Sequence, residues 1–168
     1  MISYIIQILS LLLDGILTNF LPYLQNDLSL FTPLLSVISI FLIYPFFRKE
    51  KKKYLINVFI YGMIYDLFYT NLLFWNACIF LVIGLLTIFI YKNYEISLLK
   101  IIIPIIVIIT SYELINASII WIFHLVPITL SKVIYKITHT LLLNIIYGVV
   151  IYFIISMIPN KYKKISIN

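Results

Sequence analysis

The sequence has little charge, and this shortage is the most informative feature of its composition. Asp, Glu, Lys and Arg make up only 11% of the 168 residues, whereas 64% are hydrophobic, and soluble domains average about 25% charged residues. A soluble domain with so few charged residues would lack the polar surface that it needs in water. We therefore expect an integral membrane protein. Because a spanning helix needs about 20 apolar residues, residues 1–168 allow five or six spans in one transmembrane domain.

Cysteine, histidine and catalytic motifs are also scarce or missing. The only cysteine, Cys78, excludes an intrachain disulfide and a multi-cysteine metal site. The two histidines, His124 and His139, do not form a metal site by themselves. The patterns HExxH and GxSxG, a glycine-rich phosphate loop and paired metal-ligand spacings are absent from the sequence. We therefore predict that the protein is not an enzyme and needs no cofactor.

The basic residues are gathered in a few places. Arg48–Lys53 (RKEKKK) contains five basic residues beside one acid, and such clusters mark the cytoplasmic side of a membrane protein. With six spans and both termini in the cytoplasm, ten basic residues lie inside, and two, Lys132 and Lys136, lie outside. Five spans are the second choice. The net charge of +6 is therefore explained by membrane orientation, and we expect no nucleic-acid partner.

The cluster itself has two interpretations. Its basic side chains either set the orientation only or also bind anionic lipid headgroups, at about 1 kcal/mol for each residue near the surface. These residues are Arg48, Lys49, Lys51, Lys52 and Lys53.

Hydropathy predicts an all-α protein built as a compact bundle of six transmembrane helices. The expected spans are Ile2–Leu24, Phe31–Phe47, Tyr54–Tyr69, Phe74–Tyr91, Ile101–Phe123 and Ile128–Ile158. The last stretch is too long for one untilted span. Its first part has Lys132, Lys136 and His139 on one face, so we expect it to lie along the outer surface before the chain turns inward.

Three acids, Asp14, Asp66 and Glu113, lie inside the predicted spans. A charged group near the bilayer centre costs about 2.5–3.5 kcal/mol, so each should be protonated, paired or directed at protein or water. In one interpretation the acids meet Lys132, Lys136 and His139 in a single polar cluster. In the other, each is satisfied separately by Ser, Thr, Asn or Tyr side chains of neighbouring helices.

Two helix faces are expected to meet protein instead of lipid. In the first span, polar residues recur at spacings of three and four, which places them on one stripe. They are Ser3, Gln7, Ser10, Asp14 and Thr18. In the third span, Gly62 lies one turn before Asp66, where its missing side chain allows a neighbouring helix to approach closely.

Several short motifs occur in the order and spacing of a known family. They are Phe31–Leu35 (FTPLL), Gly62–Asp66 (GMIYD), Asn76–Ala77 and Gly84. Together they resemble the rod shape-determining protein MreD, a small bacterial inner-membrane protein whose pattern is close to P-x-L-L, then G-L-L-x-D, then L-G-L-x-A, then a glycine in the following helix. Phe74 stands where the third motif has its glycine. The resemblance covers about residues 31–86, and the last third agrees only in hydropathy and length.

The resemblance implies a non-enzymatic component of the cell-elongation machinery in the bacterial cytoplasmic membrane, where it helps to organise peptidoglycan synthesis. The implied partners are the single-span protein MreC most directly, then the actin-like MreB, the glycosyltransferase RodA and a class B penicillin-binding protein. We expect the first and third spans to hold the bundle together and another face to dock the helix of MreC. The candidate structural or docking residues are Asp14, Gly62, Asp66, Asn76 and Glu113.

The alternative is a substrate-binding subunit of an energy-coupling-factor vitamin transporter, which is also small, six-spanned and basic. Such subunits resemble one another in an Ala-x-x-x-Ala motif on the first span, and the only alanines here are Ala77 and Ala117. A ligand pocket near the outer face would have Asp66, Asn76, Lys136 and His139 as possible walls. A small channel or proton-coupled carrier, the third class, has only the buried acids in its favour.

Overall fold

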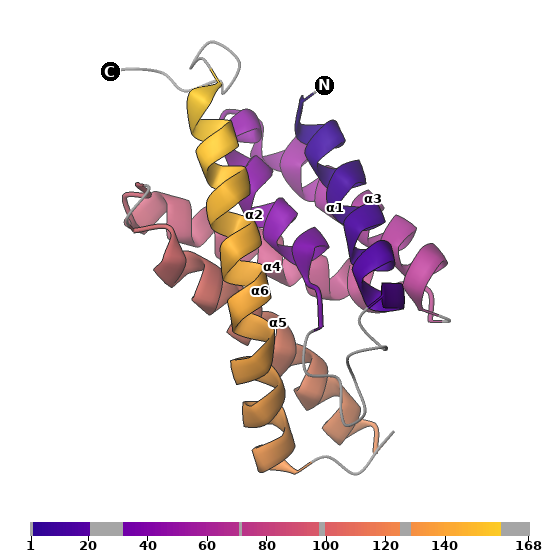
Figure 1. The fold of residues 1–168 in the computed structure, drawn as a ribbon. Helices are drawn as coiled ribbons and strands as arrows, with labels where there is room; N and C mark the ends of the chain where they lie inside the picture. Colours follow the sequence, from indigo (N-terminus) through magenta and orange to yellow (C-terminus); the bar gives the residue numbers. More distant parts are fainter. Residues whose placement is uncertain (1, 21–31, 71, 98–99, 125–128, 159–168) are drawn as a thin grey trace.

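The computed structural model describes residues 2–20, 32–70, 72–97, 100–124 and 129–158. Within these residues the protein is all-helical, with six helices and no strand (Figure 1), which confirms the all-α part of the prediction. The helices are α1 (Ile2–Phe20), α2 (Leu35–Phe47), α3 (Lys51–Tyr69), α4 (Trp75–Asn93), α5 (Ile102–Ile122) and α6 (Leu130–Met157). Four of these helices, α1, α4, α5 and α6, are long and apolar enough to cross a membrane.

Three helices follow their predicted spans to within a few residues. These are α3, α4 and α5. The predicted spans Ile2–Leu24, Phe31–Phe47 and Ile128–Ile158 lie partly outside the described residues. Three of the ten basic residues expected inside, Lys161, Lys163 and Lys164, lie wholly outside them. Because α3 begins at Lys51, the last three lysines of the cluster Arg48–Lys53 form the first turn of a helix.

The short helix α2 is the buried centre of the fold. Twelve of its 13 residues are buried, and it packs against all five other helices. At about 1.5 Å per residue it is roughly 20 Å long, less than the bilayer core of about 30 Å. A helix that is apolar on all sides is stable only when protein or lipid surrounds it. Here the surroundings are the other helices, so α2 is a core helix and not a lipid-facing one.

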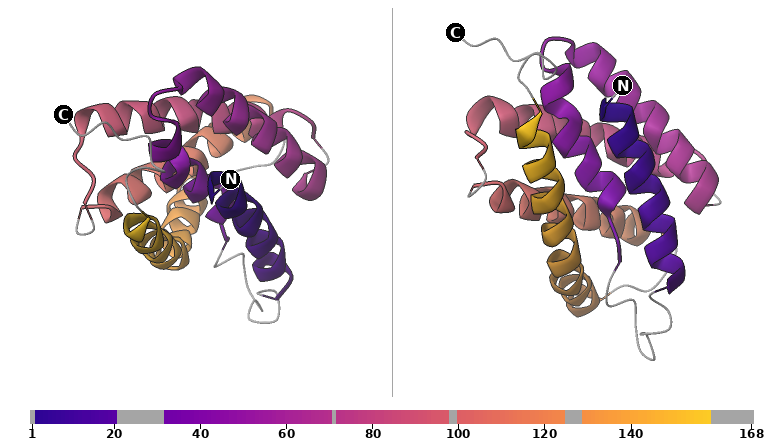
Figure 2. Two further views of the ribbon diagram at one scale, coloured as in Figure 1. Left: turned by 90° about the horizontal axis from the view of Figure 1, so that it is seen from above. Right: turned by 45° about the horizontal axis from the view of Figure 1, so that its top comes forward.

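The polar stripe of α1 meets protein, as predicted. Ser3, Gln7, Ser10 and Asp14 are buried, and only Thr18 is exposed. Tyr61 of α3 donates a hydrogen bond to the Gln7 carbonyl at 2.8 Å. The opposite face of α1 is apolar and exposed, with Tyr4, Ile5, Ile8, Leu12 and Ile16. In the view from above in Figure 2, α1 lies at the edge of the bundle.

α6 corrects one prediction. We expected its first part to lie along the surface before the chain turned inward, but residues Leu130–Met157 form one continuous helix of 28 residues, drawn in orange to yellow in Figure 1. The segment contains no proline, so nothing interrupts its backbone hydrogen bonds. The buried positions recur every three or four residues and face α5 and α2. They are Thr140, Asn144, Gly148, Ile151 and Ile155.

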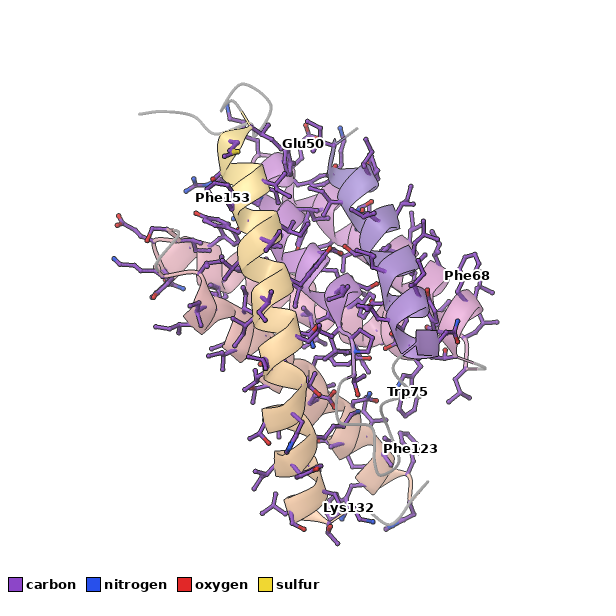
Figure 3. All side chains as sticks on the ribbon, viewed as in Figure 1. Glu50, Phe68, Trp75, Phe123, Lys132 and Phe153 are labelled. Atoms are coloured by element: carbon purple, nitrogen blue, oxygen red, sulfur yellow. The ribbon has the colours of Figure 1, made fainter. Side chains whose placement is uncertain are left out.

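The basic cluster and Lys132 lie at opposite ends of the bundle (Figure 3). Glu50, within the basic cluster, lies at the end where α1 begins and α6 finishes, and Lys132 lies at the opposite end (Figures 1 and 3). The Glu50 carboxylate is 2.6 Å from the Lys53 ammonium group, and this bond raises the pKa of Lys53 above its usual value. Both side chains lie at the surface, where such a pair contributes little to stability.

Candidate functional site

The Asp14 carboxylate of α1 caps the N-terminus of α2. Its Oδ1 accepts a hydrogen bond from the backbone N–H of Leu35 and its Oδ2 one from that of Ser36, both at 2.8 Å. The first N–H groups of a helix have no partner within the helix, and a carboxylate there also interacts favourably with the helix dipole. Leu34, the residue before α2, provides no side-chain cap. The cap is therefore supplied by a different helix, at a site where Asp14 is only 2% exposed.

Asn144 of α6 completes the same cap. Its Oδ1 accepts a hydrogen bond from the backbone N–H of Leu34 at 2.8 Å. Its Nδ2 donates to the carbonyls of Thr32 at 3.0 Å and Thr140 at 2.7 Å. Sequence reasoning missed Asn144, although Thr140, Asn144 and Gly148 are spaced four apart in an apolar run. The central helix is thus held at its N-terminus by side chains from both α1 and α6.

The Asp66 carboxylate of α3 caps α4 in the same way. The backbone N–H of Asn76 lies 3.0 Å from both carboxylate oxygens, and the N–H of Ala77 donates to Oδ2 at 3.2 Å. The Asn76 side-chain amide and the Thr70 hydroxyl each donate to Oδ1 at 2.9 Å. The Tyr112 hydroxyl of α5 in turn donates to Asn76 Oδ1 at 2.8 Å. One buried carboxylate therefore links α3 to α4, and through Asn76 to α5.

Gly62 allows this contact to form. A Cβ atom added to Gly62 would lie 2.5 Å from the Cα and 2.9 Å from the N of Ala77, and 3.1 Å from the Asn76 carbonyl oxygen. Only a glycine lets the first turn of α4 come this close to α3. Asp66 lies one turn after Gly62 on the same face of α3. The GxxxD spacing therefore places both Gly62 and the capping Asp66 carboxylate against the first turn of α4.

Phe74, directly before α4, has the left-handed backbone conformation that favours glycine. Its φ is 71° and its ψ is −3°, a region that costs an L-residue roughly 1–2 kcal/mol. This is the position at which the MreD pattern has a glycine. Phe74 therefore differs from the pattern in residue type, but its backbone has the conformation that glycine would favour.

We expect Phe74→Gly to be more stable than Phe74→Ala by about 1 kcal/mol, because only glycine relieves the left-handed backbone. Both variants remove the same ring, which is 51% exposed and stacks on Phe59 with ring centroids 6.4 Å apart. Unfolding midpoints of the purified variants in detergent measure the difference. Equal midpoints would contradict the backbone explanation.

The third acid has a different partner. Glu113 of α5 is buried, and its Oε2 lies 2.9 Å from the ammonium group of Lys136 on α6. Its Oε1 has no hydrogen-bond partner in the described part of the chain. Lys132 is exposed and His139 is half-buried, and His139 Nδ1 lies 2.8 Å from the Tyr135 carbonyl oxygen. The three acids thus have separate partners, and of the pairings considered for them Lys136 with Glu113 is the one that forms.

The two interpretations of the acids therefore apply in part. Glu113 is paired with a base, as the first interpretation expects, and Asp66 accepts bonds from Thr70 and Asn76 side chains, as the second expects. Neither anticipated the main partners of Asp14 and Asp66, which are backbone N–H groups of other helices.

The four residues considered as walls of a vitamin pocket are engaged elsewhere. Asp66 and Asn76 are bonded to each other, Lys136 is paired with Glu113, and His139 contacts its own helix. The residues that the structure describes also contain no group of three or more His, Cys, Asp or Glu side chains that could hold a metal ion. The arrangement suits cohesion between helices better than ligand binding.

Gly84, the last residue of the motif series, also lies on the contact between α3 and α4. An added Cβ would meet side-chain atoms of Leu55 at 3.3 Å and Val58 at 3.4 Å. Gly62, Asp66, Asn76, Ala77 and Gly84 thus lie between α3 and α4, and the described part of FTPLL lies at the start of α2. Comparisons of the chain with family models, with curated proteins and with solved structures give no match, so the resemblance to MreD rests on these motifs alone.

Proposed function

We propose that this protein is a non-enzymatic membrane scaffold of the MreD type, acting in the cell-elongation machinery of the bacterial cytoplasmic membrane. The observation that carries the proposal is the use of the motif residues. Gly62, Asp66, Asn76 and Ala77 form one contact between α3 and α4, and Asp14 caps the helix that follows the FTPLL motif. Residues that resemble the family are therefore those that hold the helices together.

Six crossings with both termini in the cytoplasm agree with the positions of the first and the last helix end. α1 begins and α6 finishes at the same end of the bundle (Figure 1), as an even number of crossings requires. The basic cluster Arg48–Lys53 includes Glu50, which lies at this end, whereas Lys132 lies at the other (Figure 3). The excess of basic residues at one end supports placing that end in the cytoplasm. In this topology α2 crosses the membrane surrounded by the other five helices.

The exposed apolar face of α1 is our choice for docking the transmembrane helix of MreC. α1 lies at the edge of the bundle (Figure 2), and its polar stripe is already used inside it. Apolar residues at spacings of three and four leave a continuous face on which a second helix can pack. The face consists of Tyr4, Ile5, Ile8, Leu12 and Ile16. MreB, RodA and the penicillin-binding protein would join through the same assembly.

A photocrosslinking scan tests the proposal. A photoreactive amino acid placed at Ile8 or Leu12 should give a covalent adduct with the MreC protein of the same genome, because both side chains are exposed. Matched control positions are Leu142 and Ile146, which are equally apolar and exposed but lie on α6. Adducts at the α1 positions alone support this docking face. Equal adducts at all four positions, or none at any, contradict it.

A binding measurement separates the scaffold from the transporter subunit. The purified protein should show no tight binding of vitamins in isothermal titration, because Asp66 and Asn76 already bond to each other and Lys136 is paired with Glu113. Tight binding of a vitamin would overturn the scaffold proposal.

A further inference from the structure

A cavity of about 720 Å³ opens where α2, α4 and α6 finish. Its walls come from the last residues of these helices and from the segment that follows α4. A volume of this size falls within the roughly 300–1,000 Å³ typical of small-molecule sites. None of its lining residues takes part in the caps described above.

The cavity carries an excess of positive charge. Arg48, Lys92 and Lys100 line it, and among the described lining residues Glu95 is the one acid. These three basic side chains are exposed and form no ion pair within the described residues, where the pairs are Lys53 with Glu50 and Lys136 with Glu113. Three unpaired cations around one hollow favour an anionic ligand.

A tyrosine hydroxyl without a partner also belongs to this cavity. Tyr91 lines it, and its buried hydroxyl has no hydrogen-bond partner among the residues that the structure describes. The ring is held in place by Tyr44 and Phe41, with ring centroids 5.0 and 5.1 Å away. Buried hydroxyl groups normally form a hydrogen bond. The unpaired hydroxyl of Tyr91 therefore suggests that a ligand supplies its acceptor. The Tyr152 hydroxyl, by donating to the Ile96 carbonyl at 3.1 Å, fixes the wall between α6 and the segment after α4.

We propose that this cavity binds a phosphate group presented by the headgroup of an anionic membrane lipid. Guanidinium and ammonium groups with a hydroxyl donor are the usual partners of phosphate oxygens. The inference rests on the membrane location proposed above but not on the docking of MreC. Exposed apolar side chains near the ends of α4 and α6, Phe89 and Phe153, offer surfaces for acyl chains, and Phe153 is labelled in Figure 3.

Native mass spectrometry of the full-length protein in neutral detergent tests the proposal, with phosphatidylglycerol and phosphatidylcholine as probes. We expect one phosphatidylglycerol to bind preferentially. The triple variant R48Q/K92Q/K100Q should weaken this binding by roughly tenfold or more, since each basic residue contributes about fivefold near a membrane. The matched control K49Q/K51Q/K52Q removes the same charge from exposed residues outside the cavity, and its binding should change by less than about threefold.

Two further arms complete the test. Tyr91→Phe removes only the unpaired hydroxyl, and it should weaken phosphatidylglycerol binding by about tenfold if that hydroxyl donates to phosphate. Inorganic phosphate should compete only weakly. Equal losses in the two triple variants, no preference for phosphatidylglycerol, or full displacement by inorganic phosphate would each overturn the lipid assignment. Failure here leaves the crosslinking result with MreC unaffected, so the two proposals fail separately.

Discussion

A Gly62→Ala protein is expected to lose about 2 kcal/mol of unfolding free energy. The added Cβ would lie 2.5 Å from the Cα of Ala77, and a contact with backbone cannot be relieved by a change of rotamer. Overpacking typically costs 1–3 kcal/mol, and the upper end applies here. The better helix propensity of alanine returns about 1 kcal/mol. Reversible unfolding in mixed detergent micelles, followed by circular dichroism, measures the difference.

Gly84→Ala is the matched control, because it makes the same substitution on the other side of the contact between α3 and α4. The added Cβ would meet only side-chain atoms, at 3.3 Å or more, and these can move. We therefore expect a change between zero and a gain of about 1 kcal/mol. If the two variants shift stability in the same direction and by the same amount, close approach at Gly62 is not what the helix pair depends on.

Asp66→Ala is expected to lose about 3 kcal/mol or more. It leaves the backbone N–H groups of Asn76 and Ala77, and the Asn76 amide, without their acceptor. A lost helix cap costs roughly 0.5–2 kcal/mol, and each buried donor left unpaired costs about 1–3 kcal/mol. The same unfolding experiment measures the loss.

Asp66→Asn separates the cap from the charge. The amide keeps the size of the side chain and one acceptor oxygen, so about half of the loss should be recovered. Thr70→Val removes a single donor to Asp66 and should cost less than either change. Unchanged stability and partner capture in Asp66→Ala would remove this residue from both the structural and the docking sites.

The helix count, the buried stripe of α1 and the contact at Gly62 could be predicted from the sequence because each depends on local spacing. The stripe follows from polar residues recurring with the helical period, and the GxxxD pattern from residues one turn apart. The partners of the acids could not be predicted in this way. Asp14 bonds to α2 and Asp66 to the start of α4, and such partners depend on how helices are placed relative to one another.

Two other features also required the structure. Hydropathy alone gives the same signal for a helix in lipid and for a helix in a protein core. It could therefore not show that α2 lies at the centre of the fold instead of facing lipid. The length of α6 suggested a turn, but the backbone continues as one helix from Leu130 to Met157, with its buried positions beginning at Thr140. Asn144 was missed because a neutral amide in an apolar run signals burial less strongly than a carboxylate does.

The central claim is that Asp14 and Asp66 are helix caps that hold α2 and α4 in place. Site-resolved amide hydrogen exchange in lipid nanodiscs tests it most directly. The account predicts slow exchange at Leu35, Ser36, Asn76 and Ala77, with the first pair faster only in Asp14→Leu and the second only in Asp66→Leu. Fast exchange of these amides in the unmodified protein, or rates that neither substitution changes, would contradict the claim.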